Sequence, residues 1–218
     1  MRSGTYCIVF LHAVLEALAL VLREAVRDPL TNLLTARPFR RCLAGEAMRS
    51  DAGGGSFSIV YLDADGFKAI NDRFGHAAGD RVLAELGALL ERHLAAAEVA
   101  ARNGGDEFCL LLSGTGKERA VERALRLCDA IRTHDFCVAA RLTASIGVAV
   151  YPHDATTPGE LLAIADAAMY ASKRHGRDCV SFAVSPGAYA SRRSEAARGL
   201  SRSPWRCRLI SGESFGRF

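Results

Sequence analysis

Apolar positions repeat with two different periods along the middle of this chain. Consecutive or alternating apolar residues predict buried β-strands, and such runs occupy residues 57–62, 107–112, 142–150 and 179–184. Apolar residues spaced three and four positions apart predict amphipathic helices, and they occupy residues 79–94, 117–132 and 160–175. The order is roughly β-α-α-β-β-α-β-α-β, which predicts an α+β fold with helices packed on a sheet.

Residues 1–27 form an N-terminal segment with a different pattern. Its apolar residues follow a 3-4-3-4-3 spacing that is typical of a coiled-coil seam, namely Ile8, Leu11, Leu15, Leu18, Leu22 and Ala25. Three interpretations are open: an amphipathic helix buried in the domain, a dimerising stalk, or a membrane anchor. We favour the stalk. The membrane anchor ranks third, because the run contains His12 and Glu16 and is shorter than the ~20 apolar residues of a membrane span.

The basic excess of the chain is concentrated in its C-terminal tail. The formal net charge is +4, but the chain from residue 181 onward carries seven arginines and only two acidic residues. The rest of the chain is therefore close to neutral, which argues against a nucleic-acid partner. Residues 185–218 are rich in Ser, Arg and Gly with little apolar periodicity, and we predict that they form a disordered basic tail.

The seven cysteines are scattered and form no Cys-x-x-Cys pair. Several lie inside apolar runs, where a thiol behaves as a small hydrophobic group. This pattern favours a reducing cytoplasm over a disulfide framework or a zinc site.

A first loop with residues suited to metal and phosphate binding follows the strand at residues 57–62. It begins Asp63-Ala-Asp-Gly-Phe-Lys68 and leads into a helix. A carboxylate at the end of a buried strand supplies a hard oxygen for Mg²⁺, and a helix start supplies free backbone N–H groups for phosphate. Taken alone, the Asp-x-Asp-Gly pattern is equally typical of a turn or a helix cap.

A second loop lies between two predicted strands and reads Arg102-Asn-Gly-Gly-Asp-Glu-Phe108. Gly-Gly followed by two acids predicts a tight hairpin that projects carboxylates from its tip. Such acids are often only solvated polar residues. If the tip lies beside Asp63, however, three carboxylates would repel one another and require a divalent cation.

The second loop is similar to the Arg-x-Gly-Gly-Asp-Glu-Phe signature of the GGDEF family of diguanylate cyclases. The resemblance continues in order from Asp28 to about Val180. The matching segments are Asp28-Pro-Leu-Thr31, the run from Asp63 to Asp80, Ser145-Ile-Gly147, and the run from Ala165 to Arg177. The resemblance implies a sheet like the palm of nucleotidyl cyclases and polymerases, with flanking helices, over residues 28–184 and after an N-terminal helix.

The resemblance also implies a metal site and a catalytic pair. Mg²⁺ or Mn²⁺ would be held by Asp63, the backbone carbonyl of Ala64, and Asp106, with Glu107 beside the metal as an additional ligand. Asp106 and Glu107 are the implied catalytic residues. Either Asp106 or metal coordination alone would activate the 3′-hydroxyl of GTP that attacks the second nucleotide.

The resemblance further implies a GTP site built from both ends of the domain. Asn71 and Asp80 would recognise guanine, while His76 lies in the same loop without an assigned role. The β- and γ-phosphates would be held by Lys68, Lys173 and Arg177, and by backbone N–H groups around Phe67.

The implied activity is the condensation of two GTP molecules into cyclic di-GMP across a homodimer in the cytoplasm. The alternative is a catalytically silent GGDEF domain that binds GTP or another protein. Many relatives carry an inhibitory Arg-x-x-Asp product site before the signature. Ala95 and Glu98 occupy those positions in this chain, so we expect no product inhibition by that route.

Overall fold

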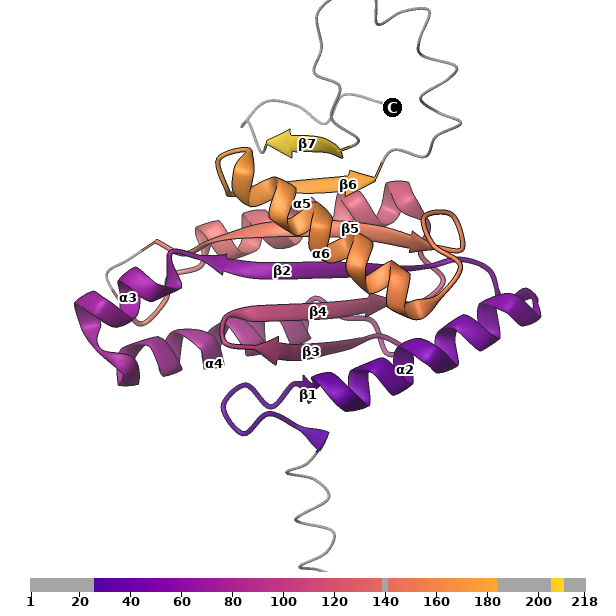
Figure 1. Cartoon of the computed structure of the whole chain (residues 1–218). Helices are drawn as coiled ribbons and strands as arrows, with labels where there is room; N and C mark the ends of the chain where they lie inside the picture. Colours follow the sequence, from indigo (N-terminus) through magenta and orange to yellow (C-terminus); the bar gives the residue numbers. More distant parts are fainter. Residues whose placement is uncertain (1–25, 139–140, 184–204, 210–218) are drawn as a thin grey trace, which may run out of the picture.

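A seven-stranded mixed sheet forms the centre of the computed structural model, which describes residues 26–138, 141–183 and 205–209 (Figure 1). The strand order is β1-β3-β4-β2-β5-β6-β7. The strands are β1 (Leu34–Thr35), β2 (Phe57–Asp65), β3 (Val99–Gly104), β4 (Glu107–Leu112), β5 (Thr143–Tyr151), β6 (Cys179–Ala183) and β7 (Trp205–Leu209). The α+β fold predicted from the sequence is therefore confirmed.

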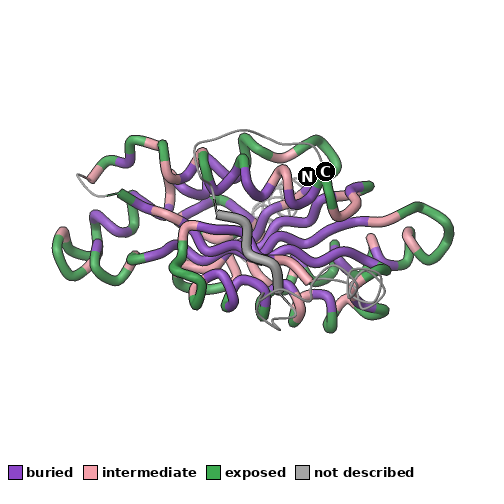
Figure 2. Tube along the Cα trace, turned by 90° about the horizontal axis from the view of Figure 1, so that it is seen from above, coloured by how far each residue is buried: buried purple, intermediate pink, exposed green. Residues whose placement is uncertain are grey.

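Helices cover both faces of this sheet. They are α2 (Ala36–Arg49), α3 (Phe67–Phe74), α4 (His76–Arg92), α5 (Lys117–Thr133) and α6 (Pro158–Arg174), and a π-helical turn, Ser50–Gly54, follows α2. One apolar core lies under α2 and α6, and the other lies under α4 and α5. Figure 2 shows the buried strands between two helical layers whose outer sides are exposed.

Strand β2 is the axis of the sheet, because all nine of its residues are buried between antiparallel neighbours β4 and β5. Side chains of a strand alternate between its two faces. Ile59 and Tyr61 accordingly pack in the α2/α6 core, while Val60 and Leu62 pack in the α4/α5 core. By the same alternation, Asp63 continues the α2/α6 face at the end of the strand.

The predicted elements are present, with bounds that differ by a few residues. Helix α2 was not predicted, because its buried residues form only a narrow stripe, Phe39, Leu43 and Ala47, in a segment rich in arginine. The pairing of β7 with β6 was not predicted either. The predicted N-terminal helix up to residue 25, and the tail on either side of β7, lie outside the described residues.

No helix in the described part of the chain has both the length and the apolar character that are needed to cross a membrane.

Helix α6 lies directly on β5 at Gly147. A Cβ atom at this position would lie 2.0 Å from the carbonyl oxygen of Ala165 and 2.2 Å from the backbone nitrogen of Met169. Only a residue without a side chain permits this approach, because both contacts are to helix backbone. The placement of α6 over the sheet therefore depends on this glycine.

We expect Gly147→Ala to lower the free energy of unfolding by about 1–3 kcal/mol, because α6 must move away from β5. Urea unfolding measures the change. Gly159→Ala is the matched control in the first turn of α6, since no atom lies within 4 Å of its added Cβ, and its effect should stay within about 0.5 kcal/mol. Equal effects of the two substitutions would contradict this account of the packing.

Candidate active site

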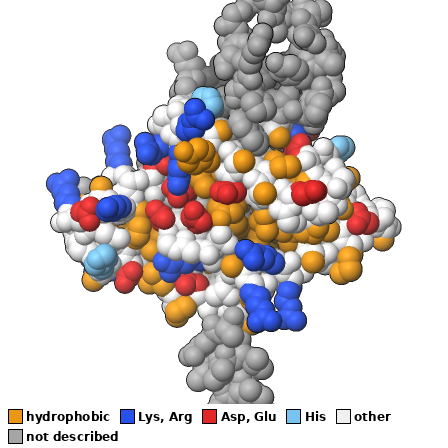
Figure 3. All heavy atoms as spheres, viewed as in Figure 1, with side chains coloured by type: hydrophobic (Ala, Val, Ile, Leu, Met, Phe, Trp, Pro, Cys, Tyr) orange, Lys and Arg blue, Asp and Glu red, His pale blue; other side chains and the backbone are white. Residues whose placement is uncertain are grey.

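The pairing of β2 with β4 brings together the two loops that carry the predicted metal-binding residues. Asp63 lies opposite Glu107, the first residue of β4. The backbone N–H of Ala64 donates to the carbonyl oxygen of Asp106 over 3.1 Å, which ties the hairpin tip to β2. The four predicted metal-binding residues are thereby neighbours. Figure 3 shows acidic and basic side chains intermixed on this face, toward the end of β2.

Negative charge is concentrated at this point and is only partly balanced. Burial raises the pKa of Asp63, the hydrogen bond from Lys173 lowers it, and the charge of Asp106 raises it further, so that the net shift is upward. Nζ of Lys173 lies 2.6 Å from Oδ2 of Asp63. Burial also raises the pKa of Asp166 on α6, and the charge of Glu107 adds to this shift. Such a site favours an additional cation.

The carboxylates fit a divalent cation that arrives with a nucleotide. Within the described ranges, no group of three or more His, Cys, Asp or Glu side chains is gathered to hold a metal ion by itself. Mg²⁺ is commonly bound by one or two carboxylates together with substrate phosphates, rather than by an all-protein cage. Asp63 and Asp106, whose charges repel each other, meet that requirement.

Arg102 braces the hairpin against the segment that precedes β1. Its Nε donates to the carbonyl oxygen of Gly105 over 2.9 Å, and its Nη1 lies 3.1 Å from Oδ1 of Asp28. Thr31 donates to the same carboxylate through its backbone N–H and its hydroxyl. Burial raises the pKa of Asp28, but these hydrogen bonds and the charge of Arg102 outweigh it and lower the pKa. Asp28 and Thr31 matched a family motif in the sequence, but no role was predicted for them.

The residues predicted to recognise guanine lie on α3 and α4. Oδ1 of Asn71 is buried and has no hydrogen-bond partner among the described residues. Gly79 makes room for it, since a Cβ there would lie 1.9 Å from Oδ1 of Asn71 and 3.1 Å from Cζ of Phe67. An unpaired buried acceptor is unfavourable unless a ligand or water supplies a donor. Asn71 therefore marks a polar binding position between the two helices.

Three other predicted GTP-binding residues lie at the surface. They are Lys68, His76 and Asp80. In the described part of the chain, no hydrogen bond or ion pair joins these three side chains to the carboxylates at the end of β2. Lys173 is the predicted phosphate ligand that the structure places directly against them.

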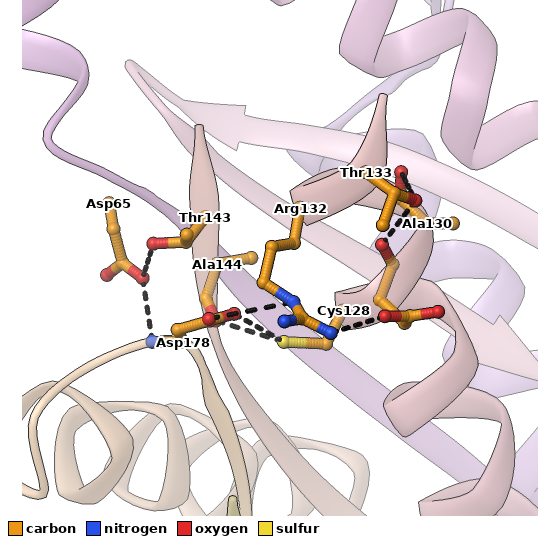
Figure 4. Close-up of polar contacts among 9 residues, drawn as sticks. Asp65, Cys128, Ala130, Arg132, Thr133, Thr143, Ala144 and Asp178 are labelled. Carbon is orange, nitrogen blue, oxygen red and sulfur yellow. Dashed lines mark hydrogen bonds and ion pairs between the residues drawn. The ribbon is translucent and has the colours of Figure 1, made fainter. Parts of the chain in front are cut away.

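Asp65 anchors the turn that carries the predicted phosphate ligand Arg177 (Figure 4). This buried carboxylate accepts hydrogen bonds from Oγ1 of Thr143 over 2.9 Å, from Oγ of Ser145 over 2.7 Å, and from the backbone N–H of Asp178 over 3.1 Å. Arg177 and Asp178 have φ angles of 66° and 46°, which are unfavourable for residues with side chains. Asp65 thus stabilises a strained turn between α6 and β6, a role that the sequence analysis did not assign.

Arg132 holds the same turn from α5. Its Nε lies 3.8 Å from Oδ2 of Asp178, and Sγ of Cys128 lies 3.5 Å from Oδ1 of that carboxylate (Figure 4). The turn is therefore held from β2 and α5 together.

Comparison with known proteins identifies the family. Residues 25–179 match the family model described as "Diguanylate cyclase, GGDEF domain". The chain therefore belongs to the GGDEF family of diguanylate cyclases, as the motifs predicted.

Two curated relatives from Pseudomonas aeruginosa show the extent of the likeness. The bifunctional diguanylate cyclase/cyclic di-GMP phosphodiesterase MucR is 37% identical over 172 residues, which cover 74% of this chain and 24% of MucR. Diguanylate cyclase TpbB is 38% identical over 160 residues, which cover 71% of this chain and 36% of TpbB. The chain thus spans less than half the length of either relative.

A solved structure agrees with the fold. The coiled coil and GGDEF domain of DgcB from Caulobacter crescentus, in complex with c-di-GMP, superimposes with a TM-score of 0.75 at 28% identity. The comparison covers 82% of this chain and 96% of that one.

We expect Asp63→Asn to raise the free energy of unfolding of the metal-free protein at pH 7. The pKa of Asp63 is raised in the folded state, so its charge destabilises the fold at neutral pH and has no such effect below the ordinary pKa of about 4. Urea unfolding at pH 7 and pH 4 measures the difference, which should shrink at the lower pH.

Asp28→Asn is the control of opposite sign. The pKa of Asp28 is lowered, so its charge stabilises the fold above its ordinary pKa and this contribution is lost as the pH falls. The variant should be less stable than the wild type at pH 7. A loss of stability in both variants at pH 7 would contradict the assignment of Asp63 as an electrostatically unfavourable residue.

Proposed function

We propose that this chain condenses two GTP molecules into cyclic di-GMP, with release of two pyrophosphates, and that each subunit of a homodimer contributes one GTP. The observation that carries this proposal is the assembly of Asp63, Asp106 and Glu107 where β2 meets the β3–β4 hairpin. Membership of the GGDEF family supports the same activity. The signature hairpin and the strand-end aspartate are both intact in this chain.

Guanine recognition would use acceptors on α3 and α4. The guanine base presents an N1–H and an N2 amino group, both of which are hydrogen-bond donors. The unpartnered Oδ1 of Asn71 and the exposed carboxylate of Asp80 are acceptors of the matching kind. Adenine lacks these donors and would leave the buried Oδ1 of Asn71 unpaired, which is the stronger form of discrimination between similar ligands.

Phosphate binding would use the cations that α6 and the turn after it provide. Lys173 contacts Asp63, so a triphosphate beside the carboxylates lies within its reach. Arg177 follows in the turn that Asp65 anchors. Lys68 and the backbone around Phe67 would complete the contacts from the start of α3.

The reaction would join the 3′-oxygen of one GTP to the α-phosphorus of the other, with breakage of the bond to pyrophosphate and loss of the hydroxyl proton. The step occurs twice to close the ring. Asp106 would accept the proton, and Asp63, Asp106, Glu107 and the carbonyl of Ala64 would hold the divalent cation. That cation, Mg²⁺ or Mn²⁺, supplies charge stabilisation at the phosphoryl oxygens. Alignment of two bound nucleotides would supply up to ~7–11 kcal/mol of the barrier reduction.

We expect Asp106→Ala to lower the rate of cyclic di-GMP formation from GTP and Mg²⁺ by about 100-fold or more, because it removes a metal ligand and the proposed base. Chromatography of the reaction mixture measures the product. Glu122→Ala is the matched control, since Glu122 is an acid on α5 that pairs with Arg126, and it should retain activity. Absence of product from the wild type, although it binds GTP and forms a dimer, would favour a catalytically silent GTP-binding domain.

A further inference from the structure

A relay of three side chains lies beneath the signature hairpin. Tyr61 is buried in β2, on the α2/α6 face of the sheet. Its hydroxyl donates to Oε2 of Glu107 over 3.0 Å and accepts from Nδ2 of Asn103 over 2.5 Å. No role for Tyr61 or Asn103 was predicted from the sequence.

A β-bulge brings Asn103 into this relay. Arg102 pairs with Phe108 and Gly104 pairs with Glu107, so Asn103 is the extra residue on β3. A bulge commonly redirects a side chain near a functional site. Here it allows the amide of Asn103 to reach across to Tyr61 in β2, although β4 lies between the two strands.

The chemistry of the three groups fixes the direction of the relay. An ionised carboxylate only accepts hydrogen bonds, and a tyrosine hydroxyl has a single proton to donate. The proton of Tyr61 therefore points to Glu107, and the amide of Asn103 donates to the hydroxyl oxygen. Bonds aligned in this way polarise and strengthen one another, and a hydrogen bond to a charged acceptor is stronger than one between neutral groups.

Glu107 needs such support, because its long side chain is only half-buried at the start of β4. Ordering a free glutamate side chain has an entropic cost. Tyr61 holds one carboxylate oxygen, while the other accepts no hydrogen bond in the part of the chain that the structure describes. The carboxylate is thus fixed beside Asp63 with one oxygen left for a ligand.

We propose that Tyr61 and Asn103 are positioning residues that hold the carboxylate of Glu107 for the divalent cation bound with the nucleotide. The inference rests on the proposed function and extends it to two residues outside the signature acids. Their effect is exerted through Glu107, without contact with the nucleotide.

Tyr61→Phe tests this directly, because it removes one hydroxyl and keeps the ring in the core. The matched control is Tyr151→Phe. Tyr151 is also buried, donates its hydroxyl to Oδ1 of Asp51 over 2.7 Å, and pairs with Phe57 at the opposite end of β2. Two measurements are compared. Steady-state kinetics give kcat and KM for GTP, and a titration gives the Mn²⁺ concentration for half-maximal thermal stabilisation with 3′-deoxy-GTP, which lacks the attacking hydroxyl.

We expect Tyr61→Phe to lower kcat about tenfold with KM for GTP nearly unchanged. It should also raise the half-maximal Mn²⁺ concentration about tenfold, as the loss of a residue that orients a metal ligand commonly does. Asn103→Ala should lower kcat and raise the half-maximal Mn²⁺ concentration by smaller factors, and it leaves the core intact. Tyr151→Phe should shift neither.

Unchanged kcat and Mn²⁺ requirement in Tyr61→Phe would overturn the inference, as would a lower kcat without any change in the Mn²⁺ requirement. Equal changes in Tyr61→Phe and Tyr151→Phe would also overturn it, because they would reflect general weakening of the core. If the wild type forms no cyclic di-GMP, the proposed function fails. The Mn²⁺ titration with 3′-deoxy-GTP still decides the role of Tyr61 in that case.

Discussion

The register of β2 against β4 is the constraint on which the candidate site depends. It places Asp63 opposite Glu107 and Tyr61 opposite Cys109. A slip by one residue would turn every side chain of β2 to the other face, moving Asp63 and Tyr61 away from α6 and exchanging the two apolar cores. Because all nine residues of β2 are buried, the hydrophobic core itself enforces the register that assembles the carboxylates.

The assembled carboxylates are held against their own repulsion. Burial and Asp106 raise the pKa of Asp63, and Lys173 offsets only part of this effect. The surrounding scaffold is correspondingly well braced, with Arg102 on Asp28, Tyr61 on Glu107, and Asp65 under the turn of Arg177. A rigid frame around an electrostatically unfavourable centre is the arrangement expected of a site prepared for a cation and an anionic substrate.

Much of this arrangement could be predicted from the sequence, because it is encoded locally. The strand before Asp63 and the hairpin at Asp106 follow from short apolar runs and turn residues, and the family motifs connect them. The braces could not be predicted, because each joins residues far apart in the chain: Asp28 and Arg102, Asp65 and Asp178, and Tyr61 with Asn103. Helix α2 was missed for a local reason, since its three buried residues form too narrow a stripe.

The most direct test of the central claim is the balance of products formed from GTP by the purified chain with Mg²⁺. Nucleotides and pyrophosphate would be quantified together over the reaction. The account predicts that cyclic di-GMP accumulates as the final nucleotide product, with two pyrophosphates released for each molecule formed. Release of GDP and phosphate, or recovery of unchanged GTP from a protein shown to bind it as a dimer, would contradict the claim that these carboxylates carry out nucleotidyl transfer.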